Sequence, residues 1–214
     1  MTSKPVSRRG FLKVGCLGVS AVGAAACGIG LAAPAPGATP VELPSFEYGE
    51  NRMNKRVLLA YASATGSTVE VSEAIAETLA GRGFCVTVRP VKENPKVSGY
   101  QAVLVGSAVQ YGNWLPEAIE FVKSNQAALK QVPVALFCVH IRNTEDNEES
   151  RKNRLAYLDT VRSLVHPVAE AFFPGRFTRQ GAAMLLPGLV ARFVPTIDLR
   201  NWDKVQSWSQ SVFA

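Results

Sequence analysis

The stretch that decides the fold reads Arg56-Val57-Leu58-Leu59-Ala60-Tyr61-Ala62-Ser63-Ala64-Thr65-Gly66-Ser67-Thr68. Its first half is a short apolar run, which is typical of a strand buried on both faces of a parallel sheet. A turn of small and hydroxyl-bearing residues follows at 62–68. Next come side chains at helical spacing: Val71, Ala74, Ile75, Thr78 and Leu79. The order of strand, polar turn and helix predicts the first unit of an α/β domain.

The same alternation continues along the rest of the chain. Further strands are predicted at 84–89, 102–106, 132–139 and 171–177. Further helices are predicted to begin at Pro116 and to run through 155–165. Gly81 and Gly83 end the first helix. The strand at 84–89 alternates in polarity and is followed by Pro90, as suits the edge of a sheet. The alternation predicts a parallel sheet with helices on both faces.

The charge pattern gives no support to nucleic-acid binding. The chain carries a formal net charge of +6, but four of its 23 basic residues lie within the first thirteen positions. Residues 41–214 carry 19 basic and 17 acidic side chains, a balance too even for a phosphate-backbone footprint. The run at 142–154 mixes both signs and predicts a solvated loop that leads into a helix.

The cysteines predict neither a metal site nor a redox dithiol. Cys16 and Cys27 lie in the first forty residues, whereas Cys85 and Cys138 lie in predicted strands. No CxxC pair is present in the sequence. We therefore expect Cys85 and Cys138 to be buried thiols.

Residues 1–40 have the organisation of an export signal, with a basic head, a weakly apolar stretch and a Pro/Ala/Gly spacer. The motif Ser7-Arg8-Arg9-Gly10-Phe11-Leu12-Lys13 resembles the twin-arginine consensus. We expect export of the folded chain to the periplasm or to the outer face of the cytoplasmic membrane. Cleavage of the leader, lipidation at Cys27 and retention as a membrane anchor all stay open. Residues 41–54 are predicted to be a linker, and 55–214 the folded domain.

The turn at 63–68 is the motif that carries chemistry. It combines four hydroxyl side chains with Gly66, which lets the backbone approach a ligand. The turn opens into a helix, so unpaired N–H groups and the positive end of the helix dipole face an anion. A Walker A loop needs Gly-Lys-Ser/Thr and a dinucleotide fingerprint needs GxGxxG, and neither is present. The turn therefore favours a mononucleotide phosphate, with helix capping without a ligand as the alternative.

These residues resemble the flavodoxin family, whose FMN phosphate loop follows the first strand with the pattern Thr/Ser-x-Thr-Gly-x-Thr. The matching residues are Ser63, Ala64, Thr65, Gly66, Ser67 and Thr68. The resemblance implies FMN as the cofactor. It also implies a flavodoxin-like, doubly wound sheet of five parallel strands in the order 2-1-3-4-5 with helices on both faces. In that order the ends of strands 1 and 3 flank the ligand crevice. Cys85 and Cys138 would then lie about 14 Å apart, beyond the reach of a disulfide.

Two further loops complete the FMN site that the resemblance implies. The second loop contains Ser107, Ala108, Val109, Gln110, Tyr111, Gly112, Asn113 and Trp114. Either Tyr111 or Trp114 stacks on the isoalloxazine ring, or both only anchor the loop on the sheet. The third loop contributes His140 and Arg142. His140 either approaches the flavin or is a satisfied loop histidine. Arg142 either offsets the charge of reduced flavin or is solvated.

Over about residues 55–212 the chain is similar to the flavodoxin-domain family that includes the quinone-coupled protoporphyrinogen dehydrogenases of bacteria. The similarity lies in residues 60–68, in Val105-Gly106-Ser107 with Tyr111-Gly112, and in Asn201-Trp202-Asp203-Lys204-Val205. It implies an FMN-dependent oxidoreductase, and no catalytic acid or base is identified. A non-enzymatic electron carrier between protein partners is the second hypothesis, and a binding module without flavin is the third.

The expected partners are a redox donor and acceptor, either a quinone or a protein. The apolar stretch at 181–194 either covers a hydrophobic substrate or contacts a membrane surface. The alternative for this stretch is a helix packed on the sheet. The leader is the other candidate for membrane contact.

Overall fold

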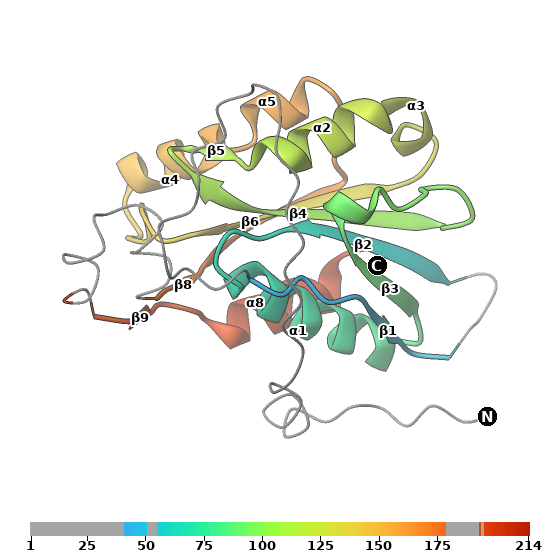
Figure 1. Cartoon of the computed structure of the whole chain (residues 1–214), viewed down its shortest axis with the longest axis horizontal. Helices are drawn as coiled ribbons and strands as arrows, with labels where there is room; N and C mark the ends of the chain where they lie inside the picture. The colour runs from blue at the N-terminus through green and yellow to red at the C-terminus, as the bar shows by residue number, and fades with distance from the viewer. Residues whose placement is uncertain (1–40, 51–54, 179–192, 194) are drawn as a thin grey trace, which may run out of the picture. The chain divides into compact units, whose positions relative to one another are not determined.

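The computed structural model describes residues 41–50, 55–178, 193 and 195–214 (Figure 1). The predicted leader and all of the 181–194 stretch except Phe193 lie outside the described residues. Their roles therefore stay predictions. The described residues include the predicted phosphate loop and the sheet that carries it.

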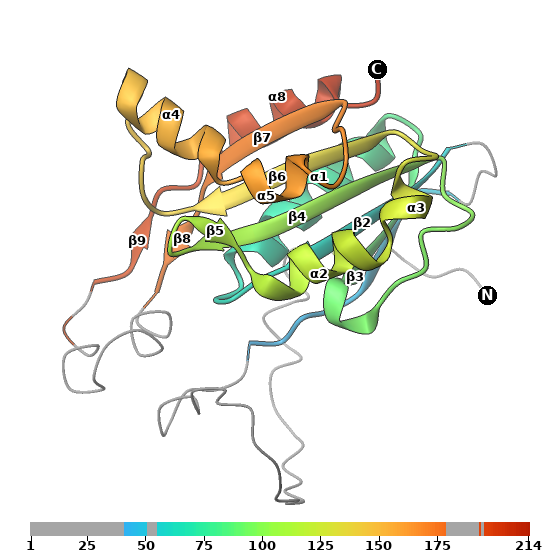
Figure 2. The same cartoon turned by 90° about the horizontal axis from the view of Figure 1, so that it is seen from above.

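Five parallel strands form the centre of the sheet, in the spatial order β3-β2-β4-β6-β7 (Figure 2). They are β3 (Cys85–Pro90), β2 (Arg56–Ala62), β4 (Ala102–Gln110), β6 (Val134–His140) and β7 (Ala169–Pro174). Counted along the chain from β2, this is the order 2-1-3-4-5, so the predicted flavodoxin-like topology is confirmed. Both faces of the sheet are covered, which explains why β6 is apolar and buried along nearly its whole length.

A sixth strand closes one edge of the sheet and corrects the expected linker. Residues 46–48 form β1 (Phe46–Tyr48), which pairs antiparallel with β3 from Phe46↔Val88 to Tyr48↔Val86. The strand at 84–89 was expected to lie at the edge, but β1 lies outside it, and Pro90 is the last residue of β3. The buried Tyr61 donates its hydroxyl proton to the carbonyl of Pro44 at 2.7 Å, which ties this segment to β2. Burial raises the pKa of Tyr61.

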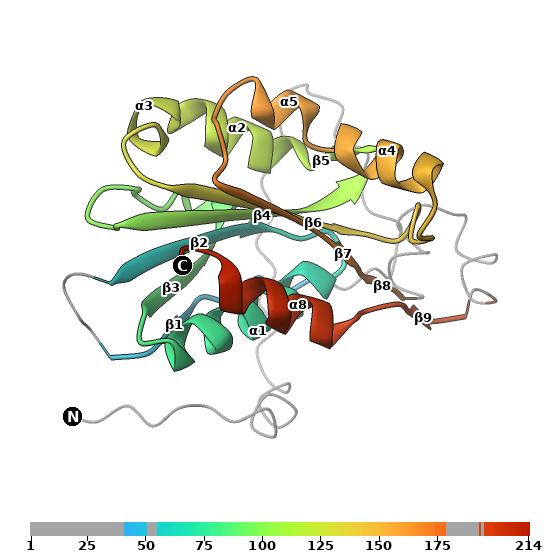
Figure 3. The ribbon, with the colours of Figure 1, turned by 180° about the vertical axis from the view of Figure 1, so that it is seen from behind.

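Helices cover both faces of the sheet (Figures 1 and 3). One face carries α2 (Pro116–Ser124), α3 (Gln126–Leu129), α4 (Glu148–Ala156) and α5 (Asp159–Arg162), and the other carries α1 (Ser67–Gly81) and α8 (Trp202–Ser211). A short 3-10 turn, η2 (Val91–Glu93), follows β3. The helix predicted at 155–165 is two helices, and α4 begins inside the run expected to be a loop. Asn147 caps α4 by accepting a hydrogen bond from Ser150 N at 2.7 Å, which explains its early start.

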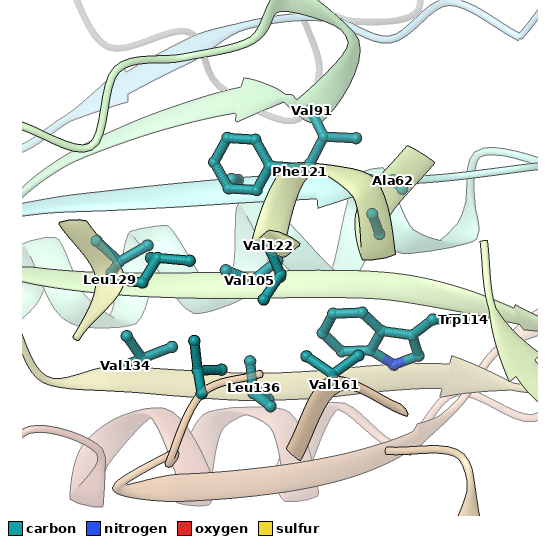
Figure 4. Close-up of a cluster of buried hydrophobic side chains, with 14 of the residues drawn as sticks. Ala62, Val91, Val105, Trp114, Phe121, Val122, Leu129, Val134, Leu136 and Val161 are labelled. Atoms are coloured by element: carbon teal, nitrogen blue, oxygen red, sulfur yellow. The ribbon is translucent and has the colours of Figure 1, made fainter. Parts of the chain in front are cut away.

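The hydrophobic core consists of two layers, one on each face of the sheet. On the α2 side, residues from β2, β4 and β6 pack with Trp114, Phe121, Leu129 and Val161 (Figure 4). On the α1 side, Ile75, Leu79, Phe137 and Phe173 belong to the second layer. Cys138 is buried as predicted, whereas Cys85 is only half-buried, and both thiols are free.

Two further features bear on function. No helix of the described residues is long and apolar enough to cross a membrane. Those residues also contain no cluster of side chains suited to hold a metal ion.

Candidate flavin site

The carboxyl ends of β2, β4 and β6 meet at one edge of the sheet. Ala62 pairs in register with Ser107, and Ser107 pairs with Cys138. Because neighbouring strands lie about 4.8 Å apart, the loops that follow them begin side by side. The three predicted loops therefore gather at one edge, where β5, β8 and β9 also lie (Figure 1).

The loop after β2 has the geometry of an anion site. Gly66 caps α1 with φ +89°, a conformation that strains residues with a Cβ atom. Ser63 Oγ accepts a hydrogen bond from Gly66 N at 3.0 Å, which closes the turn. Within the described part of the chain, the N–H groups of Ser67 and Thr68 donate no hydrogen bond. The first turn of α1 thus offers two backbone donors to an anion.

A segment distant in sequence fixes the side chain of Ser67. We call it the β8–β9 ribbon: residues 175–177 and 197–200, in which β8 (Arg176–Phe177) pairs antiparallel with β9 (Ile197–Asp198). Arg176 N donates to Ser67 Oγ at 2.9 Å. A Cβ atom on Gly175 would lie 3.1 Å from Ser67 Oγ and 2.8 Å from Val139 Cγ1. Glycine is therefore required for this close approach of the ribbon to the loop.

The second predicted loop is a tight hairpin. Gln110 on β4 pairs with Asn113 on β5 (Asn113–Trp114), and Tyr111 and Gly112 form the turn with φ +52° and +79°. Two successive positive φ values are typical of the two-residue turns that match strand twist. Ser107 Oγ accepts from Leu115 N at 3.0 Å and donates to the Ala108 carbonyl at 2.8 Å. This hydroxyl therefore holds the base of the hairpin together.

The two aromatic residues of this hairpin occupy opposite environments. Trp114 is 2% exposed and lies in the core on the α2 side (Figure 4). Its Nε1 donates to Cys138 Sγ at 3.0 Å. Tyr111, at the tip of the turn, is 85% exposed. Burial favours the anchoring role for Trp114, and Tyr111 is the ring available for stacking. Burial also raises the pKa of Cys138 to about 12, which makes its thiol unreactive.

His140, the last residue of β6, is a buried histidine of fixed tautomer. The residue is 3% exposed, and its Nδ1 is 2.7 Å from the carbonyl oxygen of Arg142. A carbonyl only accepts hydrogen bonds, so Nδ1 carries the proton and Nε2 carries the lone pair. Nε2 is buried and has no hydrogen-bond partner among the described residues. Burial is the main cause that lowers the pKa of His140 to about 4, and the charges of Arg154 and Lys204 add to it.

The loop after His140 is held from α4, and it presents the exposed Arg142 at the edge of the sheet. Arg154 Nη1 donates to the carbonyl of Asn143 at 2.5 Å and to that of Glu145 at 2.8 Å. Tyr157 packs beside the His140 ring, with 5.7 Å between the ring centroids. The backbone of this loop is therefore ordered, and the solvated interpretation of Arg142 agrees with its exposure.

The residues at this edge fit a phosphorylated flavin. The donor set at the loop consists of backbone N–H groups and hydroxyls, which suits a phosphate without a metal ion. The buried Nε2 of His140 is an acceptor without a partner among the described residues, and Tyr111 is an exposed ring. Sequence reasoning did not find Gly175, Arg176 or Arg200, because no local pattern links the ribbon to a loop over a hundred positions earlier.

Comparison with known proteins identifies the family. A model of the flavodoxin domain matches residues 58–184. The chain belongs to the flavodoxin-domain family. FMN is the cofactor of this family, in agreement with the cofactor that the resemblance implies.

Among individual proteins, protoporphyrinogen IX dehydrogenase (quinone) of Escherichia coli strain K12 is 26% identical over 106 residues, which are 45% of this chain and 59% of that enzyme. The chain thus matches less than two thirds of the relative's length.

Solved structures with a similar fold have low identity. A flavodoxin from the domain Archaea has a TM-score of 0.41 at 17% identity, over 64% of this chain and 96% of that one. A Fusobacterium nucleatum flavodoxin mutant bound to flavin mononucleotide has a TM-score of 0.43 at 15% identity, over 56% of this chain and 68% of that one. The Flv1 flavodiiron core of Synechocystis has a TM-score of 0.46 at 15% identity, over 74% of this chain and 34% of that one.

Proposed function

We propose that this protein is an exported flavodoxin-domain oxidoreductase that binds FMN at the carboxyl edge of β2, β4 and β6. The observation that carries the proposal is the loop 63–68, with its left-handed Gly66 and two N–H groups that have no partner among the described residues, in a chain of the flavodoxin-domain family. Ser63, Thr65, Ser67 and Thr68 would hold the phosphate. Tyr111 would contact the ring system, with His140 and Arg142 near it.

Bound FMN supplies the electron-transfer chemistry, and the protein positions and tunes it. Ser63 holds the loop in its anion-binding form, and the ribbon orients the hydroxyl of Ser67. His140 Nε2 stays an acceptor at neutral pH, because its neutral tautomer is fixed by the carbonyl of Arg142. It is therefore suited to accept a hydrogen bond from an N–H or O–H group, whereas it has no proton to donate.

For the electron acceptor we propose a quinone, and for the substrate a hydrophobic, porphyrinogen-like compound. The similarity to protoporphyrinogen IX dehydrogenase (quinone) supports this, although it spans part of that enzyme. The motif at 7–13 supports export by the twin-arginine route, which carries folded proteins and so allows FMN to be bound before export. Export argues against a role in haem synthesis, which is expected to be cytoplasmic.

A non-enzymatic electron carrier is the second candidate, and the exposed Tyr111 at the tip of the β4–β5 hairpin favours it. An exposed ring beside a flavin is available to a protein partner as well as to a small substrate. The even charge of residues 41–214 argues against the acidic docking face that carriers of this family tend to have.

The first test is the visible absorption spectrum of the full chain purified from cells, followed by titration of the flavin-free protein with FMN. We expect a yellow protein that takes up FMN. Replacement of Gly66 by valine should abolish binding without unfolding, because a β-branched residue cannot adopt φ +89° without strain. Gly81→Ala is the matched control, since its Cβ atom would meet nothing within 4 Å.

A colourless wild-type protein that does not bind FMN would refute the cofactor and both redox roles. With yellow protein, oxidation of reduced flavin by a soluble quinone alone would support the enzyme. Oxidation that requires an added protein partner would support the carrier.

A further inference from the structure

A network of four charged side chains lies directly beside the phosphate loop. Glu70, in the first turn of α1, accepts a hydrogen bond from Arg176 Nη2 at 3.1 Å with one carboxylate oxygen and one from Arg200 Nη1 with the other. Arg200 Nε also donates to Asp198 Oδ1 at 2.8 Å. The arginines and Asp198 belong to the β8–β9 ribbon, and Glu70 follows Ser67 by three residues. The formal charges of the four groups cancel.

Glu70 is the member that opposes a phosphate at the loop. A carboxylate in the first turn of a helix is favourable when no ligand is present. A phosphate dianion at the same helix end is repelled by it, and the side chain of Glu70 is only 33% exposed, so water screens the repulsion incompletely. A flavin with a phosphate therefore binds well at this loop only if the charge of Glu70 is neutralised.

The two arginines are not equivalent in this respect. Arg200 is 10% exposed, is shared with Asp198 and lies over the Trp202 ring at 4.8 Å. The positive charge of Arg200 is therefore shared between Glu70 and Asp198, and its hydrogen bond to Asp198 lowers the pKa of that carboxyl group to about 2. Arg176 has one carboxylate partner, Glu70, among the described residues. Its backbone N–H contacts Ser67 Oγ, and its buried Nε has no hydrogen-bond partner among those residues.

We propose that Arg176 is a positioning residue that makes the flavin site prefer FMN to riboflavin, because it neutralises Glu70 beside the phosphate loop. The inference rests on the proposed function, since it assumes that the loop binds a flavin. Riboflavin has the same ring system without the phosphate, so its affinity does not depend on the charge at the loop. Through this network the ribbon controls the charge beside the phosphate loop.

The test is a fluorescence titration of flavin-free full chain with FMN and with riboflavin at low ionic strength. We expect Arg176→Gln to raise the Kd for FMN about tenfold. The variant leaves the negative charge of Glu70 less compensated within roughly 10 Å of the phosphate dianion, and water screens this repulsion only partly. The Kd for riboflavin should stay unchanged. The double variant Arg176→Gln/Glu70→Gln should bring the Kd for FMN back to within about threefold of wild type, because the repelling carboxylate is gone.

Lys55→Gln is the matched control. It also removes one positive charge, but Lys55 precedes the seven residues of β2 and lies at the opposite end of the strand from the loop. At about 3.3 Å per residue it is more than 20 Å away. Its Kd for FMN should equal that of wild type.

Three results would overturn the inference. One is an equal loss of FMN and riboflavin affinity in Arg176→Gln, which would mean that Arg176 only holds the ribbon. The second is unchanged FMN affinity in that variant, and the third is failure of Glu70→Gln to restore it. If the wild-type chain binds neither flavin, the proposed function fails and this inference fails with it. Wild-type binding of FMN combined with any of the three results refutes this inference alone.

Discussion

At the scale of single residues, Gly106 shows how closely the sheet and the core are matched. Gly106 lies on β4 opposite Phe137 on β6, and a Cβ atom there would lie 1.9 Å from the ring. Phe137 is fully buried and packs against Phe173 and Trp208. The ring has no room to move away, so the glycine is a packing requirement of the α1 side of the sheet.

We predict that Gly106→Ala lowers the free energy of unfolding by about 3 kcal/mol, the cost of overpacking a rigid core. Urea unfolding followed by circular dichroism measures this. Gly81→Ala, with no atom within 4 Å of its new Cβ, should leave stability unchanged or raise it by up to about 1 kcal/mol. Equal stability of the two variants would show that the Phe137 ring rearranges.

His140 makes stability depend on pH between about 4 and 6.5. Its pKa is about 4 in the folded protein and 6.5 when unperturbed, so the unfolded chain binds more protons in this interval. The contribution of the neutral His140 to stability is therefore fully present above about pH 6.5 and is lost as the pH falls toward about 4. Between pH 7 and pH 5 the free energy of unfolding should fall by about 2 kcal/mol more in wild type than in His140→Gln.

His166 provides the control for this experiment, since it is the other histidine of the chain and is exposed. His166→Gln should keep the pH dependence of the wild type when unfolding is measured at both pH values. If His140→Gln keeps it as well, the imidazole is not buried in its neutral form.

The sequence predicts which loops form the candidate site, but it does not predict the partner of each side chain. Ser63, Gly66 and Tyr111 sit in local turns, which a sequence pattern specifies directly. The partners of Ser107, Trp114 and His140 depend on tertiary structure: a backbone N–H after the hairpin, a thiol on a neighbouring strand and a carbonyl in a loop. Such partners can be assigned only once register and loop geometry are known.

At the scale of elements, α8 depends on one side chain from the far end of α1. Arg82 Nη1 donates to the carbonyls of Ser209 and Val212 at 2.7 and 2.6 Å. Ser209 lies in the last turn of α8 and Val212 is the C-cap residue that follows it, where the backbone acceptors have no partner within the helix. A cation at this end also offsets the negative end of the helix dipole.

We predict that Arg82→Gln destabilises the domain by about 2 kcal/mol, as expected for the loss of hydrogen bonds from a charged donor. Hydrogen exchange should accelerate first in α8. Arg89→Gln, which breaks the exposed ion pair with Glu47, is the control and should change stability by less than about 0.5 kcal/mol. Uniform acceleration of exchange across the sheet would contradict a local role for Arg82.

Elements with a strong periodic pattern were predictable, and short ones were not. The five parallel strands and α1 could be inferred from long apolar runs and helical spacing. Strand β1 has three residues, and its stability comes from the edge of β3 and from the core, not from its own sequence. The start of α4 could not be predicted from the sequence, because its charged residues and its cap at Asn147 are equally typical of a polar loop.

At the scale of the whole molecule, the segment before β2 is part of the domain. Leu43, Phe46 and Tyr48 pack against the core on the α1 side, and Pro44 accepts the hydrogen bond of the buried Tyr61. Removal of this segment leaves a buried hydroxyl without a partner and an open strand edge on β3, which other chains can pair with.

We therefore predict different effects of two N-terminal truncations. A chain that begins at residue 41 should unfold at the same urea concentration as the full chain. A chain that begins at residue 51 should lose about 4 kcal/mol, from apolar burial and the orphaned hydroxyl, and should associate at high concentration. Urea unfolding measures the stability of each truncated chain, and light scattering measures its association. Equal stability of the two truncated chains would show that residues 41–50 are a linker after all.

The pairing of α1 with α8 has a consequence for synthesis on the ribosome. Arg82 contacts Ser209 across 127 positions, and Arg200 contacts Glu70 across 130. While translation is under way, one face of α1 has no neighbour and the anion loop lacks the ribbon that orients Ser67. The contacts between the ribbon and the loop therefore cannot form during synthesis until Arg200 has left the exit tunnel, more than 130 residues after Ser67.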